Sequence, residues 1–499
     1  MLGSSLKQLL KGSFWILIAS LATRIAGLIL LPILARKLEP AGLGIYGLVQ
    51  QTMQTADNLG RVGLDLAIHR NGAQYQTLGK EETGRIFGVG GLLMIAVGGI
   101  FATALWLYPD DLAINFLGDA QLAPWLPIAG WGVLFLAIAA PASSYLAALQ
   151  AFGAYAISTS ASTMLGNAIT ILVAFNFGLG GALWSQSLTN LIQVVLGWSV
   201  SWSVFRQKGI KLRLDRFGQT AIAMFKLGLP FYASNFLAGV VGLPFLGYVT
   251  RLGGIEQVGY IRISQSLGQL ISFLPTVIAP VLVSSLSASF AVDPNQHQQI
   301  KSLHFRAIWL IILTVCVGLC LSLEVTVPLL FGKEYGGSIS LVRLGIYGAA
   351  LSSLGGIVNQ YLTAEGKTSV IGAVQVLSLI LLILLALIFI PLYSGFGLLL
   401  AQAITSIFTL IYLSRSGLQD ICKTNRTQLI MVGLITLCTS IGIFALPLLE
   451  MNSNWRIVMT VVVSLLVIGL CISQVFTRVE IRMIATLIKN RLLQLTSKI

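Results

Sequence analysis

A stripe of polar side chains interrupts an apolar stretch of the sequence at residues 42–69. These side chains recur at steps of three and four residues, which places them on one face of a helix. The set consists of Gln50, Gln54, Asp57, Asn58, Arg61 and Asp65. Polar groups on an apolar helix are stabilised by water or by other polar groups, and not by lipid. We therefore expect this face to line a central cavity.

Three arginines within apolar stretches are candidates for binding an anionic head group: Arg24, Arg61 and Arg262. A guanidinium donates two parallel hydrogen bonds to an oxyanion such as phosphate and stays charged when buried. Arg24 has no acidic residue within one helical turn, which favours a ligand. For Arg61 the alternative is an ion pair with Asp57 and Asp65, four residues away on either side. For Arg262 the alternative is a side chain that extends to the nearby membrane surface.

Carboxylates are rare in the apolar stretches, and each one is a candidate for coupling to a proton or Na⁺ gradient. They are Asp57, Asp65 and Glu324. The alternative is a hydrogen-bonded structural carboxyl, and for Glu324 this is the interpretation that we favour.

The composition identifies the class of protein that carries these groups. Of the 499 residues, 56% are hydrophobic and only 10% are charged, whereas about 25% of the residues of a soluble domain are charged. About fourteen apolar stretches are each long enough to cross a bilayer. They lie near residues 12–36, 42–69, 84–107, 124–149, 155–177, 181–205, 220–249, 256–289, 303–330, 339–362, 368–392, 396–415, 427–449 and 455–477. The sequence predicts an all-α integral membrane protein.

The distribution of charge predicts the orientation in the membrane. With an even number of spans and a cytoplasmic N-terminus, most of the 31 Lys and Arg residues fall on the cytoplasmic side, as the positive-inside rule requires. The net charge of +14 therefore reflects orientation, and we expect no nucleic-acid partner. Residues 478–499 form a basic amphipathic tail, which we expect to bind membrane lipids at the cytoplasmic surface.

An internal repeat relates the first part of the chain to the second at a nearly constant offset. The matched pairs include Lys11 and Lys226, Gly44 and Gly259, Gln50 and Gln265, Gln54 and Gln269, Tyr145 and Tyr361, Gln186 and Gln402, and Thr189 and Thr405. Such a repeat is typical of two parallel six-helix bundles related by a pseudo-two-fold axis along the membrane normal. We assign residues 1–210 to the first bundle, 211–419 to the second and 420–477 to a final pair of helices.

The repeat also extends the polar stripe. Gln265 and Gln269 match Gln50 and Gln54, so both halves are expected to direct the same face into the central cavity. Arg24 matches Gly239, so only the first half supplies this cation. We therefore expect the substrate to contact Arg24, Arg61 and Arg262 together with the amides Gln50, Gln54, Asn58, Gln265 and Gln269.

The sequence shows no pattern typical of an enzyme or of a cofactor site. The segment Gly366-Lys367-Thr368 has Tyr361 where a phosphate-binding P-loop has its first glycine. The three histidines, at 69, 297 and 304, form no ligand set. We therefore expect a transporter with neither a metal nor a nucleotide, driven by an ion gradient, the membrane potential or the gradient of its substrate.

Several short motifs resemble those of one family. They are Ala35-Arg36-Lys37-Leu38-Glu39-Pro40, Gly44-Ile45-Tyr46-Gly47, Asn58-Leu59-Gly60 and Leu149-Gln150-Ala151-Phe152-Gly153. In these segments the chain resembles the polysaccharide exporters and O-antigen flippases of the multidrug/oligosaccharidyl-lipid/polysaccharide (MOP) superfamily. The resemblance implies translocation of a polyprenyl-pyrophosphate-linked oligosaccharide across the cell inner membrane, for polysaccharide biosynthesis.

The same resemblance implies further roles. Arg24 is similar to the cavity arginines that bind pyrophosphate in lipid II flippases, and the final helix pair is associated with the lipid tail. A glycan polymerase is a candidate partner. A cation-coupled multidrug exporter of the same superfamily is the alternative function. Fourteen spans and a cavity richer in amides and arginine than in acids favour the flippase.

Overall fold

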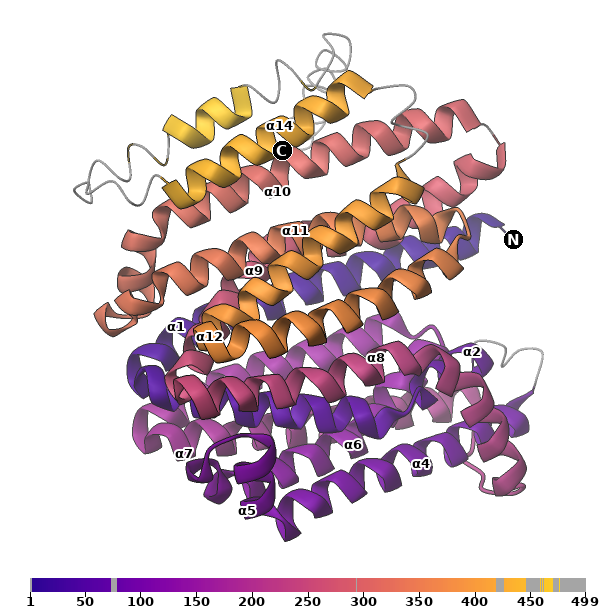
Figure 1. Cartoon of the computed structure of the whole chain (residues 1–499). Coiled ribbons are helices and arrows are strands. Elements are labelled where there is room, and N and C mark those ends of the chain that lie inside the picture. The colour runs from indigo at the N-terminus through magenta and orange to yellow at the C-terminus, as the bar shows by residue number, and fades with distance from the viewer. Residues whose placement is uncertain are drawn as a thin grey trace, which may run out of the picture. The chain divides into compact units, whose positions relative to one another are not determined.

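The computed structural model describes residues 2–72, 79–292, 294–418 and 426–445, together with residues 458, 460, 462–469 and 475. The elements of this part of the chain are all helical, so the all-α expectation is confirmed for it (Figure 1). The predicted tail at 478–499 lies outside the described residues. The helices are α1 (Leu2–Arg61), α2 (Leu64–Gly72), α4 (Lys80–Leu107), α5 (Pro109–Asp111), η1 (Leu112–Phe116), η2 (Ala120–Trp125), α6 (Leu126–Ala148), α7 (Phe152–Lys208), α8 (Phe217–Gly253), α9 (Ile255–Val292), α10 (Pro294–Leu330), η3 (Lys333–Ser338), α11 (Ile339–Ala364), α12 (Thr368–Gly417) and α14 (Arg426–Ala445).

Three of the long helices are pairs of arms joined at one non-helical residue. The break lies at Glu39 in α1, at Gly178 in α7 and at Ser394 in α12. Pro40 follows the first break, and a residue before proline is sterically driven out of the helical region. Each arm exceeds the roughly 20 residues needed to cross a bilayer, so one helix of this kind can supply two spans.

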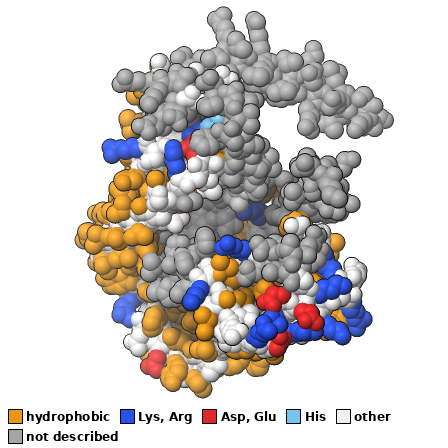
Figure 2. Space-filling model, turned by 90° about the vertical axis from the view of Figure 1, so that its right-hand side faces the viewer, with side chains coloured by type: hydrophobic (Ala, Val, Ile, Leu, Met, Phe, Trp, Pro, Cys, Tyr) orange, Lys and Arg blue, Asp and Glu red, His pale blue; other side chains and the backbone are white. Residues whose placement is uncertain are grey.

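Six helices of the described chain are apolar and long enough to cross a membrane. They expose large apolar side chains, including Ile100, Phe177 and Leu172, and hydrophobic side chains cover broad areas of the face in Figure 2. Such exposure is unfavourable in water and suits contact with lipid. The chain is a multi-pass membrane protein, and the count of fourteen spans stays a prediction.

By its internal contacts the chain divides into two units. Unit 1 contains Met1–Ile263 and Ala386–Leu398, and unit 2 contains Ser264–Leu385 and Leu399–Ile499. The division of the chain by its sequence repeat stays a prediction.

In unit 1, the segment after α7 is fixed to α4 by backbone contacts and charge. A Cβ added to Gly84 would lie 2.0 Å from the Lys211 carbonyl oxygen, so only glycine permits this approach. The Arg213 amide donates to the Gly84 carbonyl over 3.0 Å, and Arg85 donates to Asp215 over 2.9 Å. This hydrogen bond holds the pKa of the Asp215 carboxyl below its usual value.

In unit 2, α14 packs on α10 and α11 through pairs of polar side chains. Trp309 donates to Thr436 over 3.0 Å, and the hydroxyls of Tyr347 and Ser440 lie 2.7 Å apart. These bonds attach the predicted additional helix at residues 427–449 to the helices of the second repeat. Hydrogen bonds between helices satisfy groups that lipid cannot.

A buried charge cluster lies where α10 meets the end of α11. Glu365 forms ion pairs with Lys301 and, over 2.8 Å, with Lys367. Burial raises the pKa of the Glu365 carboxyl, but the two lysines outweigh this effect and leave the pKa lowered. Lys301 and Glu365 have side chains that are only 1% exposed. Either buried charge would destabilise the fold if its partner were removed.

The backbone repeats in register with the sequence. Glu39 and Gly254, which are equivalent in the repeat, have φ of 59° and 83° and ψ of 174° and 161°. Gly178 and Ser394, also equivalent, have φ of 58° and 49° and ψ of −137° and −123°. A third equivalent pair, Gln150 and Gly366, also has positive φ. The two halves of the chain therefore bend at equivalent residues, although the residue types differ.

Gly178 and Ser394 have nearly the same backbone conformation. Placing serine at the first position and glycine at the second should therefore change the stability of the protein in opposite directions. An L residue in this backbone region is strained by about 1–3 kcal/mol, and glycine is not. Ser394→Gly should raise the melting temperature of the detergent-solubilised protein, and Gly178→Ser should lower it. Space is not a factor at Gly178, because an added Cβ there would meet nothing within 4 Å. Shifts of the same sign in both variants would contradict the argument.

Candidate functional site

Five of the six residues of the polar stripe, all except Asp65, lie on the second arm of α1. Gln54 and Asn58 are exposed, whereas Gln50, Asp57 and Arg61 are half-buried. Exposed amides on an apolar helix require water or a polar partner. This arm therefore presents a polar face in a chain that is otherwise suited to lipid.

Arg61 is paired with Asp57. Its Nε and Nη2 donate to Oδ2 of Asp57 over 3.0 and 2.8 Å, and the two side chains are 26% and 12% exposed. Of the two acids in the ion-pair interpretation of Arg61, Asp57 forms the ion pair that the structure shows.

The expectation that Asp65 continues the same helical face is wrong. α1 ends at Arg61, and Val62 and Gly63 both have positive φ before α2 begins at Leu64. The reason is a close backbone contact, since a Cβ added to Gly63 would lie 2.5 Å from the Gly228 carbonyl oxygen. Asp65 instead accepts a hydrogen bond from the Leu66 amide over 2.8 Å.

Arg262 lies where α1 crosses the beginning of α9. The crossing is reciprocal: a Cβ on Gly44 would lie 2.1 Å from the Ile255 carbonyl oxygen, and one on Gly259 would lie 2.5 Å from that of Pro40. Gly44 and Gly259 are equivalent in the repeat, as are Pro40 and Ile255. Equivalent residues that exchange contacts in this way define a local two-fold relation.

Arg262 stands on the axis of this crossing. Its equivalent in the repeat is Gly47, and a Cβ on Gly47 would lie 3.8 Å from the Arg262 side chain. Since Gly47 has no side chain, the aliphatic part of Arg262 can lie against the α1 backbone. The arginine is thus held at the point where the two repeats meet.

The partners of Arg262 are neutral. Its Nη2 donates to the side-chain oxygen of Gln50. The Gln50 amide lies 3.5 Å from the Gln186 side-chain oxygen, which also accepts from the Tyr46 hydroxyl over 3.2 Å. Within the described residues no carboxylate forms an ion pair with Arg262. A guanidinium held by amides keeps its positive charge available to an anion.

The remaining predicted residues are placed as follows. Arg24 is half-buried on the first arm of α1, and Gln265 and Gln269 are exposed on α9. These two glutamines follow Arg262 along the helix but belong to unit 2. That they share one cavity with Gln50 and Gln54 stays a prediction.

Glu324 is bound by a base. It forms an ion pair with Arg343 of α11, whose Nε also donates to the Cys320 carbonyl over 3.4 Å. The Arg343 side chain is only 7% exposed, so a carboxylate partner offsets the cost of burying its charge. This contact favours the structural interpretation of Glu324.

Sequence reasoning gave no site role to Tyr46, Gln186 or Arg343. Gln186 carried a signal, because it recurs as Gln402 in the repeat. Tyr46 belongs to one of the family-like motifs, but its hydrogen bond joins residues 140 positions apart. A pairing over such a distance is decided by how the helices pack.

Comparison with known proteins places the chain in a family. The model of the polysaccharide biosynthesis protein family matches residues 9–290. A comparison with curated proteins gives no match. Among solved structures, the lipid II flippase MurJ in an inward closed conformation superposes with a TM-score of 0.69 at 16% identity, over 92% of this chain and 98% of MurJ.

Two further solved structures have the same fold. An inward-facing multidrug resistance MATE transporter of the MOP superfamily gives a TM-score of 0.62 at 16% identity, over 81% of this chain and 96% of that one. A MOP superfamily transporter from Pyrococcus furiosus Vc1 gives 0.55 at 17% identity, over 82% and 95%. The fold is thus that of the MOP superfamily transporters. More particularly, the chain belongs to the polysaccharide biosynthesis protein family.

The Asp57 and Arg61 pair predicts a measurable coupling. Asp57→Asn and Arg61→Gln should each lower the melting temperature, because each one leaves a half-buried charge without its partner. The double variant should be less destabilised than the sum of the single changes, with a coupling of about 1 kcal/mol. Additive losses would contradict a stabilising ion pair.

Proposed function

We propose that this protein is a flippase that moves a polyprenyl-pyrophosphate-linked oligosaccharide from the cytoplasmic to the outer leaflet of the inner membrane. Membership of the polysaccharide biosynthesis protein family supports the substrate class. The fold shared with MOP transporters supports translocation by alternating access.

The observation that carries the proposal is Arg262 at the crossing of the repeats, held by neutral groups. Pyrophosphate is a dense anion, and its passage through roughly 30 Å of hydrocarbon requires a wet cationic path. An arginine on a pseudo-two-fold axis can remain in contact with a ligand while either half moves. Arg24, from the first repeat only, supplies a second cation on the same polypeptide.

The arrangement of the halves is part of the proposal. Two parallel six-helix bundles would enclose the cavity, with both termini in the cytoplasm. The repeated backbone breaks and the reciprocal contact of Gly44 and Gly259 support a pseudo-two-fold axis along the membrane normal. The prenyl chain would stay in lipid beside the final helices, and a glycan polymerase would receive the product.

The contacts of the three acids rank them as candidates for ion coupling. Asp57 and Glu324 form ion pairs with Arg61 and Arg343. Asp65 accepts a backbone hydrogen bond, and it is the first acid to test for ion coupling. A membrane potential or the substrate gradient would need none of the three.

The test removes the two cations separately. In cells that depend on this protein for surface glycan, Arg24→Ala and Arg262→Ala should each lower export without lowering protein abundance. Loss of a charged hydrogen bond of about 1.5–3 kcal/mol corresponds to a tenfold to hundredfold weaker complex. Native mass spectrometry of the solubilised protein should show matching loss of bound polyprenyl-pyrophosphate lipid. Arg415→Ala, at an exposed position near the end of α12, is the control.

Two results would overturn this function. Normal export by both variants would remove the anion-binding role of the arginines. Bound organic cations in place of lipid, with efflux that depends on Asp65, would identify a cation-coupled multidrug exporter instead.

A further inference from the structure

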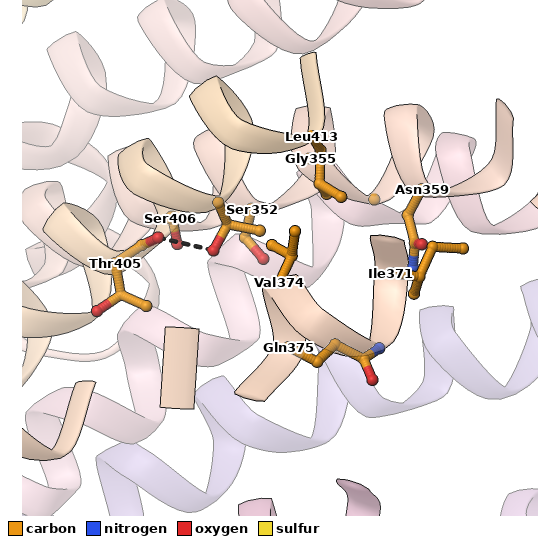
Figure 3. Close-up of a pocket in the computed structure, with 11 residues that line it drawn as sticks. Ser352, Gly355, Asn359, Ile371, Val374, Gln375, Thr405, Ser406 and Leu413 are labelled. Carbon is orange, nitrogen blue, oxygen red and sulfur yellow. Dashed lines mark hydrogen bonds between the residues drawn. The ribbon is translucent and has the colours of Figure 1, made fainter. Parts of the chain in front are cut away.

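Unit 2 contains a cavity, with hydroxyl and amide side chains in its lining, that the flippase proposal does not use. It has a volume of about 320 Å³ and lies between α11 and the two arms of α12. Figure 3 shows Asn359 and Ile371 at one end, Thr405 and Ser406 at the other, and Val374 between them. The lining is completed by Ser352, Gly355, Gly356, Gln375, Thr409 and Leu413.

The polar groups of this lining are hydroxyls and amides, and none of these described residues carries a charge. Two buried atoms, Oδ1 of Asn359 and Oγ1 of Thr405, have no hydrogen-bond partner within the described chain. A buried polar atom without a partner costs about 1–3 kcal/mol. The other hydroxyl and amide groups of the lining offer hydrogen-bond donors and acceptors to a ligand.

The equivalent helices of unit 1 are joined by two side-chain hydrogen bonds. Asn190 donates to the Gly132 carbonyl of α6 over 3.1 Å, and the Trp198 indole donates to the Ile138 carbonyl over 2.7 Å. At the equivalent positions the second repeat has Ser406 and Ser414. Replacing an amide and an indole by hydroxymethyl groups removes the side chains that join these helices in unit 1. The two repeats thus differ at these two positions, and Ser406 is one of the residues that line the cavity.

We propose that this cavity is a subsite for one uncharged sugar ring of the translocated glycan. A neutral polyol requires both donors and acceptors, which hydroxyl and amide side chains provide. A pyrophosphate would require arginine or lysine, and an organic cation would require acids or aromatic faces. The volume is at the small end of ligand sites, which suits a single ring. This inference rests on the proposed flippase function.

The test fills the cavity without disturbing its walls. An added Cβ at Gly356 would meet nothing within 4 Å, so Gly356→Leu places a side chain in open space on α11. Leucine also favours a helix over glycine, so the variant should fold. Gly372→Leu is the matched control, because Gly372 is equally open but does not line the cavity.

Native mass spectrometry with two probes separates the subsite from the function as a whole. One probe is polyprenyl pyrophosphate, and the other is the same lipid carrying one N-acetylhexosamine. Gly356→Leu should bind the glycosylated probe at least tenfold more weakly and the bare lipid as the wild type does. Equal binding of both probes would overturn the subsite while leaving the flippase intact. Failure of wild type to bind either probe would overturn both proposals.

A second variant tests the hydrogen bonds themselves. Asn359→Leu removes an unpaired buried oxygen, so the melting temperature should stay the same or rise. Its affinity for the glycosylated probe should fall all the same. A lower melting temperature with unchanged sugar binding would assign Asn359 a structural role and contradict the subsite.

Discussion

The cost of placing charge among apolar helices governs this structure. In the described chain, several such charges are offset by an opposite one: Arg61 by Asp57, Arg343 by Glu324 and Lys301 by Glu365. Each pair fixes two segments or two helical turns together, because separating the partners leaves a charge that the surroundings do not solvate. Arg262 differs in being held by an amide. The paired charges stabilise the fold, whereas the Arg262 guanidinium is held by the neutral Gln50 side chain.

Backbone geometry complements these pairs. Long helices fold back on themselves at Glu39, Gly178 and Ser394, and glycines permit helices to touch at Gly44 and Gly259. The bends recur in the second half even where a serine replaces a glycine, so the path of the chain is maintained more strictly than the residue type. Bends of this kind give one segment of the chain two helical arms, each long enough to cross a membrane.

The two repeats share this path of the backbone but differ in the side chains at equivalent positions of their helices. In unit 1, hydrogen bonds of Asn190 and Trp198 join α7 to α6. In unit 2 the equivalent positions are serines, and Ser406 lines a cavity without charged residues in its described lining. The crossing of α1 and α9 is the point at which equivalent residues of the two repeats meet.

The sequence by itself determined the membrane class, the helical fold, the repeat and the polar face of α1. Each of these depends on local composition, on periodicity or on a fixed offset along the chain, and these quantities can be read from residue order. The partners of the charges were decided only by tertiary structure. Arg262 meets Gln50, and Arg343 meets Glu324, because helices far apart in the sequence cross at those residues. The break before Asp65 also follows from a remote contact, that of Gly63 with Gly228, which no local pattern encodes.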